Sequence, residues 1–207
     1  MKVREIAVIL ALTLLVVNAG AQQRASNSPA GDRSNELPRF ELGIAFSGVH
    51  LSENNNFGVG ARAVVNLTSF FSLEGEGNLF LNDATPGILS RGRAVEGLFG
   101  PKIGFRTDTV GIFGKVRPGV ISFSNTVQGI TFNPTVPSAF TIETGRLTEP
   151  ALDLGTVIEF YPARHWAWRT DLGNTMIFYR SSSFLGVTLP GTTHSNFQFS
   201  TGIQYRF

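Results

Sequence analysis

Three side chains of this 207-residue sequence could together perform hydrolysis or acyl transfer. His194 and Ser195 are adjacent, and Asp83 lies on a distant segment of the chain. A serine hydroxyl becomes a nucleophile when a histidine accepts its proton and a carboxylate orients that histidine. This chemistry therefore depends on whether the folded chain brings the three side chains together.

Glu74 and Glu76 are a second candidate, a pair of carboxylates two residues apart. Paired carboxylates can act as general acid and general base. On a strand they share one face, and with basic residues nearby the simpler interpretation is a structural ion network. The absence of cysteine from the sequence excludes thiol catalysis, disulfides and cysteine zinc sites. Since no phosphate loop, nucleotide motif or metal-ligand spacing occurs either, we expect no metal and no cofactor.

The composition indicates that part of the surface does not face water. Charged residues, 17 basic and 15 acidic, make up 15% of the chain, against about 25% in an average soluble domain. Glycine (23) and phenylalanine (18) are both abundant. The net charge of +2 gives no electrostatic reason to expect a nucleic-acid partner.

The first 21 residues have the order of a secretory signal peptide. Lys2 and Arg4 precede an apolar run over residues 6–17, and Ala19-Gly20-Ala21 offers a cleavage site. As a helix this run would rise about 18 Å, well short of the roughly 30 Å hydrocarbon core, so it does not suit a membrane anchor. We predict a signal peptide over 1–21, a flexible polar leader over 22–38 and one folded domain over 39–207.

From residue 39 onward, apolar and polar residues alternate with a period of two. In the first such segment, Phe40, Leu42, Ile44 and Phe46 alternate with polar or small residues. This period is typical of β-strands with two different faces. It predicts eight strands and no helix of consequence, with strands at about residues 40–47, 58–67, 71–79, 95–106, 112–120, 152–160, 166–173 and 197–207.

The predicted connections alternate between long and short. Long ones cover about residues 50–56, 81–90, 124–149 and 180–195, and tight turns lie near 68–69, 107–109 and 162–164. This alternation is typical of a transmembrane barrel with short periplasmic turns and longer extracellular loops. The predicted fold is therefore all-β: an eight-stranded antiparallel up-and-down transmembrane β-barrel with both chain ends on the periplasmic side.

The polar face of these strands carries as many acidic as basic residues. A soluble barrel would turn that face to water, whereas seven acids against seven bases, interspersed with glycine, fit a filled ionic interior in which every charge needs a partner. We predict an interior ion network of Arg62, Glu74, Glu76, Glu96, Lys102, Lys115, Arg117, Asp153, Glu159, Arg169 and Asp171, with Glu41, Arg106 and Arg206 on the same face.

Aromatic residues gather at the predicted strand ends, where the interfacial belts of a membrane barrel lie. We expect one girdle at the short-turn end and one at the long-loop end, formed respectively by Phe70, Phe71, Tyr161, Trp166, Trp168, Tyr205 and Phe207 and by Phe57, Phe80, Phe123, Phe178, Tyr179 and Phe197. We interpret His165 as another interfacial residue. Pro101 and Pro118 interrupt predicted strands, and a closed barrel has no free edge, so we expect bulges or locally broken ladders there.

The C-terminal residues Ser200-x-Gly202-x-x-Tyr205-x-Phe207 resemble the terminal signal of Gram-negative outer-membrane proteins. With the signal peptide and the strand pattern, they make the stretch 39–207 similar to the small eight-stranded OmpA/OmpX-type barrels and the outer membrane protein beta-barrel domain family. The resemblance implies that the barrel-assembly machinery recognises Ser200, Gly202, Tyr205 and Phe207 as an assembly signal. It also implies secretion through the inner membrane and residence in the cell outer membrane, among its lipids.

Outer-membrane barrels include lipid A deacylases and acyltransferases, so we compare His194, Ser195 and Asp83 with the catalytic pattern of those enzymes. The deacylase pattern has His and Ser two residues apart on a strand, whereas here they are adjacent and expected in a loop. Side chains fill the interior of eight strands, so we do not expect an open porin. We predict a non-enzymatic, monomeric barrel with a structural or interaction role, whose extracellular partner meets the loops at 124–149 and 180–195. The alternative is a lipid A-modifying enzyme.

Overall fold

The computed structural model describes residues 38–51, 54–81, 92–132, 140–184 and 187–207, and these form ten strands. They are β1 (Phe40–Leu51), β2 (Asn54–Asn66), β3 (Phe71–Phe80), β4 (Ala94–Arg106), β5 (Val110–Phe132), β6 (Phe140–Ala163), β7 (Trp166–Tyr179), β8 (Ser182–Phe184), β9 (Val187–Leu189) and β10 (Thr192–Arg206). These ranges contain no helix that is long and apolar enough to cross a membrane. The predicted signal peptide, and all of the predicted leader except Pro38, lie outside the described residues.

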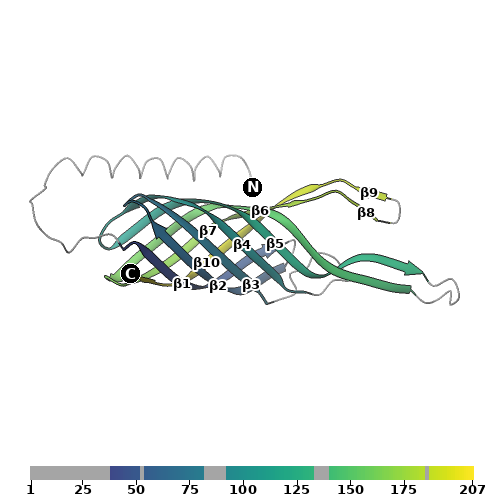
Figure 1. Ribbon diagram of the computed structural model, residues 1–207, viewed down its shortest axis with the longest axis horizontal. Helices are drawn as coiled ribbons and strands as arrows, with labels where there is room; N and C mark the ends of the chain where they lie inside the picture. The colour runs from purple at the N-terminus through teal and green to yellow at the C-terminus, as the bar shows by residue number, and fades with distance from the viewer. Residues whose placement is uncertain (1–37, 52–53, 82–91, 133–139, 185–186) are drawn as a thin grey trace, which may run out of the picture.

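Eight of these strands form one closed antiparallel barrel (Figure 1). Each barrel strand pairs with the barrel strands before and after it in the chain, and β1 pairs with β10 to close the ring. β8 and β9 form a separate two-stranded sheet. The eight-stranded up-and-down fold predicted from the alternation of apolar and polar residues is confirmed.

β5 and β6 continue beyond the barrel as a two-stranded ribbon. β4 pairs with β5 only as far as Phe123, and β7 pairs with β6 only from Ala151, whereas β5 and β6 stay paired as far as Phe132 and Phe140. Figure 1 shows the ribbon projecting from the end of the barrel opposite the C-terminus. The prediction of a loop over 124–149 was therefore wrong for most of its length, because a hairpin can stay paired without alternating apolar and polar residues.

The predicted loop over 180–195 also contains strands. β8, β9 and the beginning of β10 lie within it, so His194 and Ser195 belong to a strand and not to a loop. At the start of β10, Thr192 and Thr193 pair with the end of β7. Threonine is β-branched and favours extended backbone, which explains how this polar segment continues the barrel strand.

Side chains alternate between a buried interior and an exposed outer wall. On β3, for example, Glu74 and Glu76 are buried, whereas Leu73 is half-buried and Leu79 is exposed. Large exposed apolar side chains occur on every barrel strand: Phe40, Leu42, Ile44 and Phe46 on β1, Val59 on β2, Leu79 on β3, Val95, Phe99 and Ile103 on β4, Val116 and Val120 on β5, Ile158 and Phe160 on β6, Trp166, Trp168 and Leu172 on β7, and Phe197, Ile203 and Tyr205 on β10. The apolar face points outward and the charged face inward.

Four aromatic residues assigned to the outer girdles lie inside the barrel instead. Phe80 and Phe123 are fully buried, Tyr161 is 6% exposed, and Tyr179 is half-buried and packs against buried interior residues. Phe80 is an even number of residues from the inward Glu76, and Tyr161 from the inward Glu159, so the alternation of a strand turns both rings inward. The assignment was wrong because a position near a strand end does not decide which side of the sheet a residue faces.

The two strand prolines lie at a single break in the barrel ladder. β4 and β5 pair on both sides of residues 99–101 and 116–118 with the register unchanged, but not across these residues. Pro101 and Pro118 both fall in this gap. Because proline has no N–H to donate, placing both at one seam confines the lost hydrogen bonds to a single stretch. Of the two expectations, the structure has the locally broken ladder and not a bulge.

Candidate functional site

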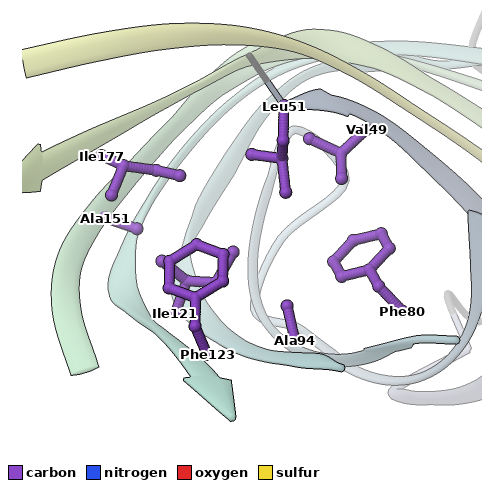
Figure 2. Packing of buried hydrophobic residues seen from close by; sticks show 8 residues of the cluster. All are labelled: Val49, Leu51, Phe80, Ala94, Ile121, Phe123, Ala151 and Ile177. Carbon is purple, nitrogen blue, oxygen red and sulfur yellow. The ribbon is translucent and has the colours of Figure 1, made fainter. Parts of the chain in front are cut away.

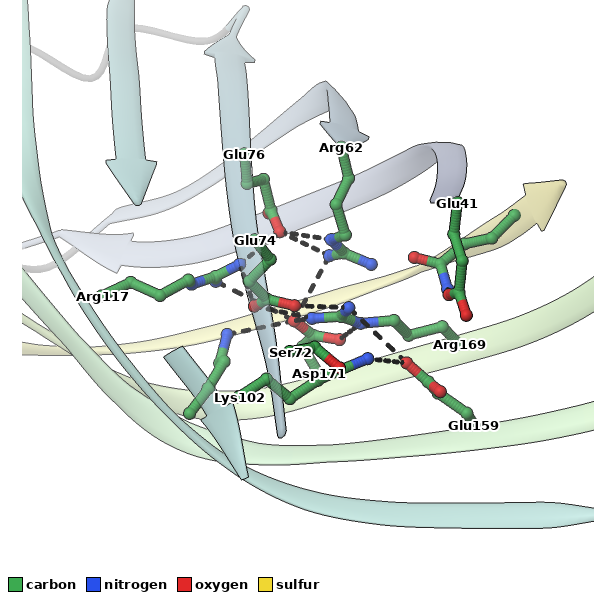
Figure 3. A network of polar contacts seen from close by, with 12 residues as sticks. Glu41, Arg62, Ser72, Glu74, Glu76, Lys102, Arg117, Glu159, Arg169 and Asp171 are labelled. Atoms are coloured by element: carbon green, nitrogen blue, oxygen red, sulfur yellow. Dashed lines mark hydrogen bonds and ion pairs between the residues drawn. The ribbon is translucent and has the colours of Figure 1, made fainter. Parts of the chain in front are cut away.

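Arg169 on β7 lies at the centre of the charged interior (Figure 3). Its Nη1 and Nη2 donate to the two carboxylate oxygens of Glu74 at 2.7 and 3.0 Å. Its Nε donates to Asp171 at 2.6 Å. A planar guanidinium that binds a carboxylate through two parallel hydrogen bonds holds it both strongly and in one orientation.

Arg117 on β5 extends this network across the barrel. Its guanidinium lies 3.0 Å from Glu74 and 2.6 Å from Glu76. It also lies 2.6 Å from Asp153 on the neighbouring strand β6. One cation therefore joins β3 to β6 through the centre of the barrel, which no backbone pairing does.

Arg62 and Lys115 complete the middle of the network. Arg62 on β2 donates to Glu76 through Nε at 2.7 Å. Lys115 on β5 lies 2.8 Å from Asp153 and 3.1 Å from Asp171. Each of these carboxylates thus meets more than one basic group, which is the condition under which buried charges are compensated.

A second group of charges lies toward the short-turn end. Lys102 donates to Glu159 at 2.5 Å, and the hydroxyl of Tyr161 donates to the other oxygen of Glu159 at 2.5 Å. Arg106 donates to the Tyr161 oxygen at 2.8 Å and lies 3.3 Å from Glu41. Tyr161 is therefore part of the interior network, a role that its assignment to the outer girdle missed.

Glu96 differs from the other ten residues of the predicted network, all of which make ion pairs in the described part of the chain. Its partners are neutral: Asn78 Nδ2 at 2.8 Å and Gln198 Nε2 at 2.9 Å. The sequence analysis considered only charged residues and missed these amides. The period of two could have found them, since Asn78 follows the inward Glu76 by two positions and Gln198 precedes the inward Ser200 by two.

Apolar side chains fill the interior between the ion network and the loop end of the barrel. We call this cluster the apolar plug; it consists of Val49, Leu51, Phe80, Ala94, Ile121, Phe123, Ala151 and Ile177, with Leu147 and Tyr179 packed against it. Figure 2 shows these side chains converging from the surrounding strands. The rings of Phe123 and Tyr179 stack with centroids 6.5 Å apart. The plug adds apolar contacts at the loop end of the barrel interior, a feature that the sequence analysis did not predict.

The candidate hydrolytic residues do not form a site in the described structure. His194 and Ser195 are consecutive on β10, so their side chains leave opposite faces of the strand. The His194 ring packs edge-on against Tyr179, with centroids 5.3 Å apart. Asp83 lies outside the described residues. A base and a nucleophile on opposite faces of a strand cannot share the hydrogen bond that this chemistry requires.

The two other histidines make local contacts at opposite ends of the barrel. His50 Nδ1 lies 2.8 Å from Asn55 Oδ1. His165 Nδ1 lies 3.0 Å from the carbonyl oxygen of Arg206, and its ring stacks on Tyr205. Within the described ranges, no group of three or more His, Cys, Asp or Glu residues is arranged to hold a metal ion.

Of the four residues of the predicted assembly signal, Ser200, Gly202 and Tyr205 lie on β10, and Phe207 directly follows it. Ser200 points inward and accepts a hydrogen bond from Arg62 Nη2 at 2.8 Å. A Cβ at Gly202 would clash with the backbone carbonyl oxygen of Ile44 on β1, so glycine lets the two strands approach at the closing seam. Tyr205 and Phe207 are exposed, and their rings make an edge-to-face contact with centroids 4.9 Å apart.

Comparison with known proteins agrees with this architecture. No family model and no curated protein matches the sequence, but solved structures do. Neisserial surface protein A is similar over 81% of this chain and 96% of its own, with a TM-score of 0.51 and 11% identity. Ail, the attachment invasion locus protein of Yersinia pestis, is similar over 81% of this chain and 96% of its own, with a TM-score of 0.49 and 14% identity. The closed ring of eight antiparallel up-and-down strands, together with its likeness to Neisserial surface protein A, gives this chain the fold of the small eight-stranded outer-membrane β-barrels.

Proposed function

We propose that this protein is a non-enzymatic β-barrel of the outer membrane that crosses the bilayer with its strands and meets a partner with the segments beyond its loop end. The observation that carries the proposal is the distribution of polarity. Charges are buried inside the barrel, while large apolar side chains are exposed on every barrel strand, as much as 67% for Ile44 and 60% for Phe99. Soluble monomers rarely expose a continuous apolar surface of this kind.

A bilayer accounts for both halves of this distribution. Hydrocarbon covers the apolar wall, and a closed barrel satisfies its backbone hydrogen bonds between strands without leaving an edge. Lipids of the outer membrane are then the principal partners of the wall. The closed ring needs no second copy to complete its sheet, which supports a monomer.

The interior supports a barrel that neither conducts nor catalyses. The ion network occupies the middle of the barrel and the apolar plug its loop end. Side chains therefore fill the space that a channel would need. The separation of His194 and Ser195 onto opposite faces of β10 gives the lipid A-modifying alternative no support.

The ribbon of β5 and β6 is the surface that we assign to an extracellular partner. Its segments 126–132 and 140–145 pair with each other beyond the last residues that pair with β4 and β7. Because the ribbon projects beyond the loop end of the barrel (Figure 1), a partner outside the cell can reach it. We also propose that a signal peptide over 1–21 directs secretion. The barrel-assembly machinery then recognises the C-terminal signal formed by Ser200, Gly202, Tyr205 and Phe207.

Cell fractionation combined with gel mobility tests the location and the fold. A closed membrane barrel resists SDS until it is heated, so the protein should be recovered with outer membranes and change its mobility on boiling. Recovery in the soluble periplasmic fraction, with identical migration before and after boiling, would contradict the proposal. Lipid A mass spectrometry of cells with and without the protein tests the absence of enzymatic activity, and a protein-dependent change in acylation would disprove it.

A further inference from the structure

The carboxyl group of Glu96 on β4 has no basic partner in the described part of the chain. The residue is 1% exposed. Its Oε2 accepts the two amide hydrogen bonds from Asn78 and Gln198, and no described group hydrogen-bonds to its Oε1. A carboxylate that is buried without a compensating cation is strongly unfavourable, whereas the neutral acid is not.

Two carboxyl groups disfavour a negative charge on Glu96, those of Asp153 on β6 and Glu76 on β3. Asn78 links Glu96 to Glu76, since its Nδ2 donates to Glu76 at 3.0 Å and to Glu96 at 2.8 Å. Neighbouring carboxylates disfavour a further negative charge between them.

The bases on neighbouring strands are bound to other carboxylates. Arg117 and Lys115 on β5 contact Asp153, at 2.6 and 2.8 Å. Arg62 on β2 contacts Glu76. These cations offset the charges of the acids around Glu96, and none of them lies within ion-pair distance of Glu96 itself in the described structure.

The other surroundings of Glu96 are neutral or apolar. Gln198 on β10 accepts a hydrogen bond from Thr175 on β7, which fixes the amide with its NH2 group toward Glu96. Ala94, two residues away on β4, and Phe80, its pairing partner on β3, belong to the apolar plug. Glu96 therefore lies at the boundary between the ion network and the plug.

We propose that Glu96 is a proton-binding site, a carboxyl group that the folded barrel holds in its neutral form at the boundary between the ion network and the apolar plug. The proton removes a charge that would otherwise border apolar side chains. A metal ion does not suit the position, because both neighbouring amides present N–H groups and a metal ion would require their oxygens. This site goes beyond the proposed membrane and interaction role and does not depend on it.

The glutamine variant Glu96→Gln separates this site from the rest of the network. Glutamine has the shape of a neutral glutamic acid, so Glu96→Gln should unfold at the same temperature as the wild type at about pH 4, where the unfolded wild type also holds the proton. At neutral pH the wild type must take up a proton to fold, so Glu96→Gln should unfold at a higher temperature than the wild type. Glu76→Gln, which removes a carboxylate bound to two arginines, should unfold at a lower temperature. Because the folded wild type holds a proton that the unfolded chain has released, its stability should fall as the pH rises until the folded barrel also loses the proton. Glu96→Gln should lack this part of the pH dependence.

The test uses the full-length protein in vesicles of ether-linked phosphatidylcholine, whose lipids have no ester carbonyl band to overlap that of a carboxylic acid. Infrared spectra should show the carbonyl band of a protonated carboxylic acid at neutral pH in the wild type and not in Glu96→Gln. Glu149→Gln is the matched control, because Glu149 is also buried but lies 3.9 Å from Arg180; it should keep the band. Unfolding temperatures are read from gel mobility between about pH 4 and pH 8, because the stability linked to the proton falls once the unfolded chain begins to release it.

Four results would overturn the proposal. The wild type could lack the band, or Glu96→Gln could keep it. Glu96→Gln could lose as much stability as Glu76→Gln or fail to fold, although a neutral isostere should be tolerated. Added Na⁺, Mg²⁺ or Ca²⁺ could raise the unfolding temperature of the wild type and not that of Glu96→Gln, which would identify a metal site instead.

Discussion

Glu41 on β1 and Arg206 on β10 lie directly opposite each other across the seam at which the barrel closes. Arg206 Nε lies 3.5 Å from Glu41 Oε1. The same carboxylate accepts hydrogen bonds from Asn66 on β2, from Gln204 on β10 and from Arg106 on β4, at 2.8, 3.1 and 3.3 Å. A single buried side chain thus links the first strand of the barrel to three others, including the last.

Replacing Glu41 with Gln should weaken the closed barrel. The amide would leave the two arginines beside it with a weaker partner, at a cost of about 1–4 kcal/mol. The measurement is the temperature at which the unboiled gel form converts to the unfolded form. Asp108→Asn, in the exposed turn between β4 and β5, is the control and should change nothing; an equal loss in both variants would contradict a specific role for Glu41.

Glu76→Gln should destabilise the centre of the network by a similar amount, about 1–4 kcal/mol. Glu76 lies between Arg62 and Arg117, and neither guanidinium has access to water that could replace the lost charge. Urea unfolding in lipid vesicles gives the difference in free energy. A variant as stable as the wild type would show that these contacts do not contribute to stability.

Cysteines at positions 73 and 76 should label differently from the bilayer. Leu73 alternates with the inward Glu74 and Glu76 and points outward, so Leu73→Cys should react with a maleimide dissolved in the lipid and Glu76→Cys should not. By the same geometry, Leu73→Arg should cost about 2–4 kcal/mol at mid-depth and less near the rim. The opposite labelling pattern would mean that the faces of the barrel are inverted.

Gly202→Ala should impair closure of the ring, whereas Gly97→Ala should not. A Cβ at Gly202 meets the Ile44 carbonyl of the neighbouring strand, and a Cβ at Gly97 has no atom within 4 Å. The yield of the SDS-resistant form after refolding measures this difference. Equal yields for the two variants would show that the seam can widen to admit a methyl group.

Deleting Phe207 should lower the amount of inserted barrel in cells while leaving the stability of the finished barrel almost unchanged. Phe207 is 60% exposed at the rim and its ring contacts Tyr205 outside the barrel, so its deletion removes no interior side-chain contact and only the two backbone hydrogen bonds to Arg39 and Phe40. Quantifying the barrel in outer membranes and its unfolding temperature separates the two effects. Normal insertion of the deletion variant would contradict the proposed assembly signal.

The sequence by itself determined the barrel, the number of its strands and the side of the sheet that each charged residue of the predicted strands faces. All three follow from the period of two, which is local: once Glu74 is known to face inward, the side of Glu76 follows from backbone geometry alone. The same rule, applied to every strand residue, would have placed Tyr161, Phe80 and Asn78 inside. The girdles were instead predicted from how near each residue lies to a strand end, and that position does not determine which side of the sheet a residue faces.

Only the tertiary structure decided which inward residues meet. Arg169 and Glu74 are bound to each other although 95 positions separate them, and Glu96 is left with amides while its acidic neighbours hold the arginines. These pairings depend on the register of all eight strands and on the tilt that closure imposes, and alternation along one strand contains neither. The apolar plug and the ribbon of β5 and β6 have the same origin, because contacts across the barrel and pairing beyond it join segments that no local pattern relates.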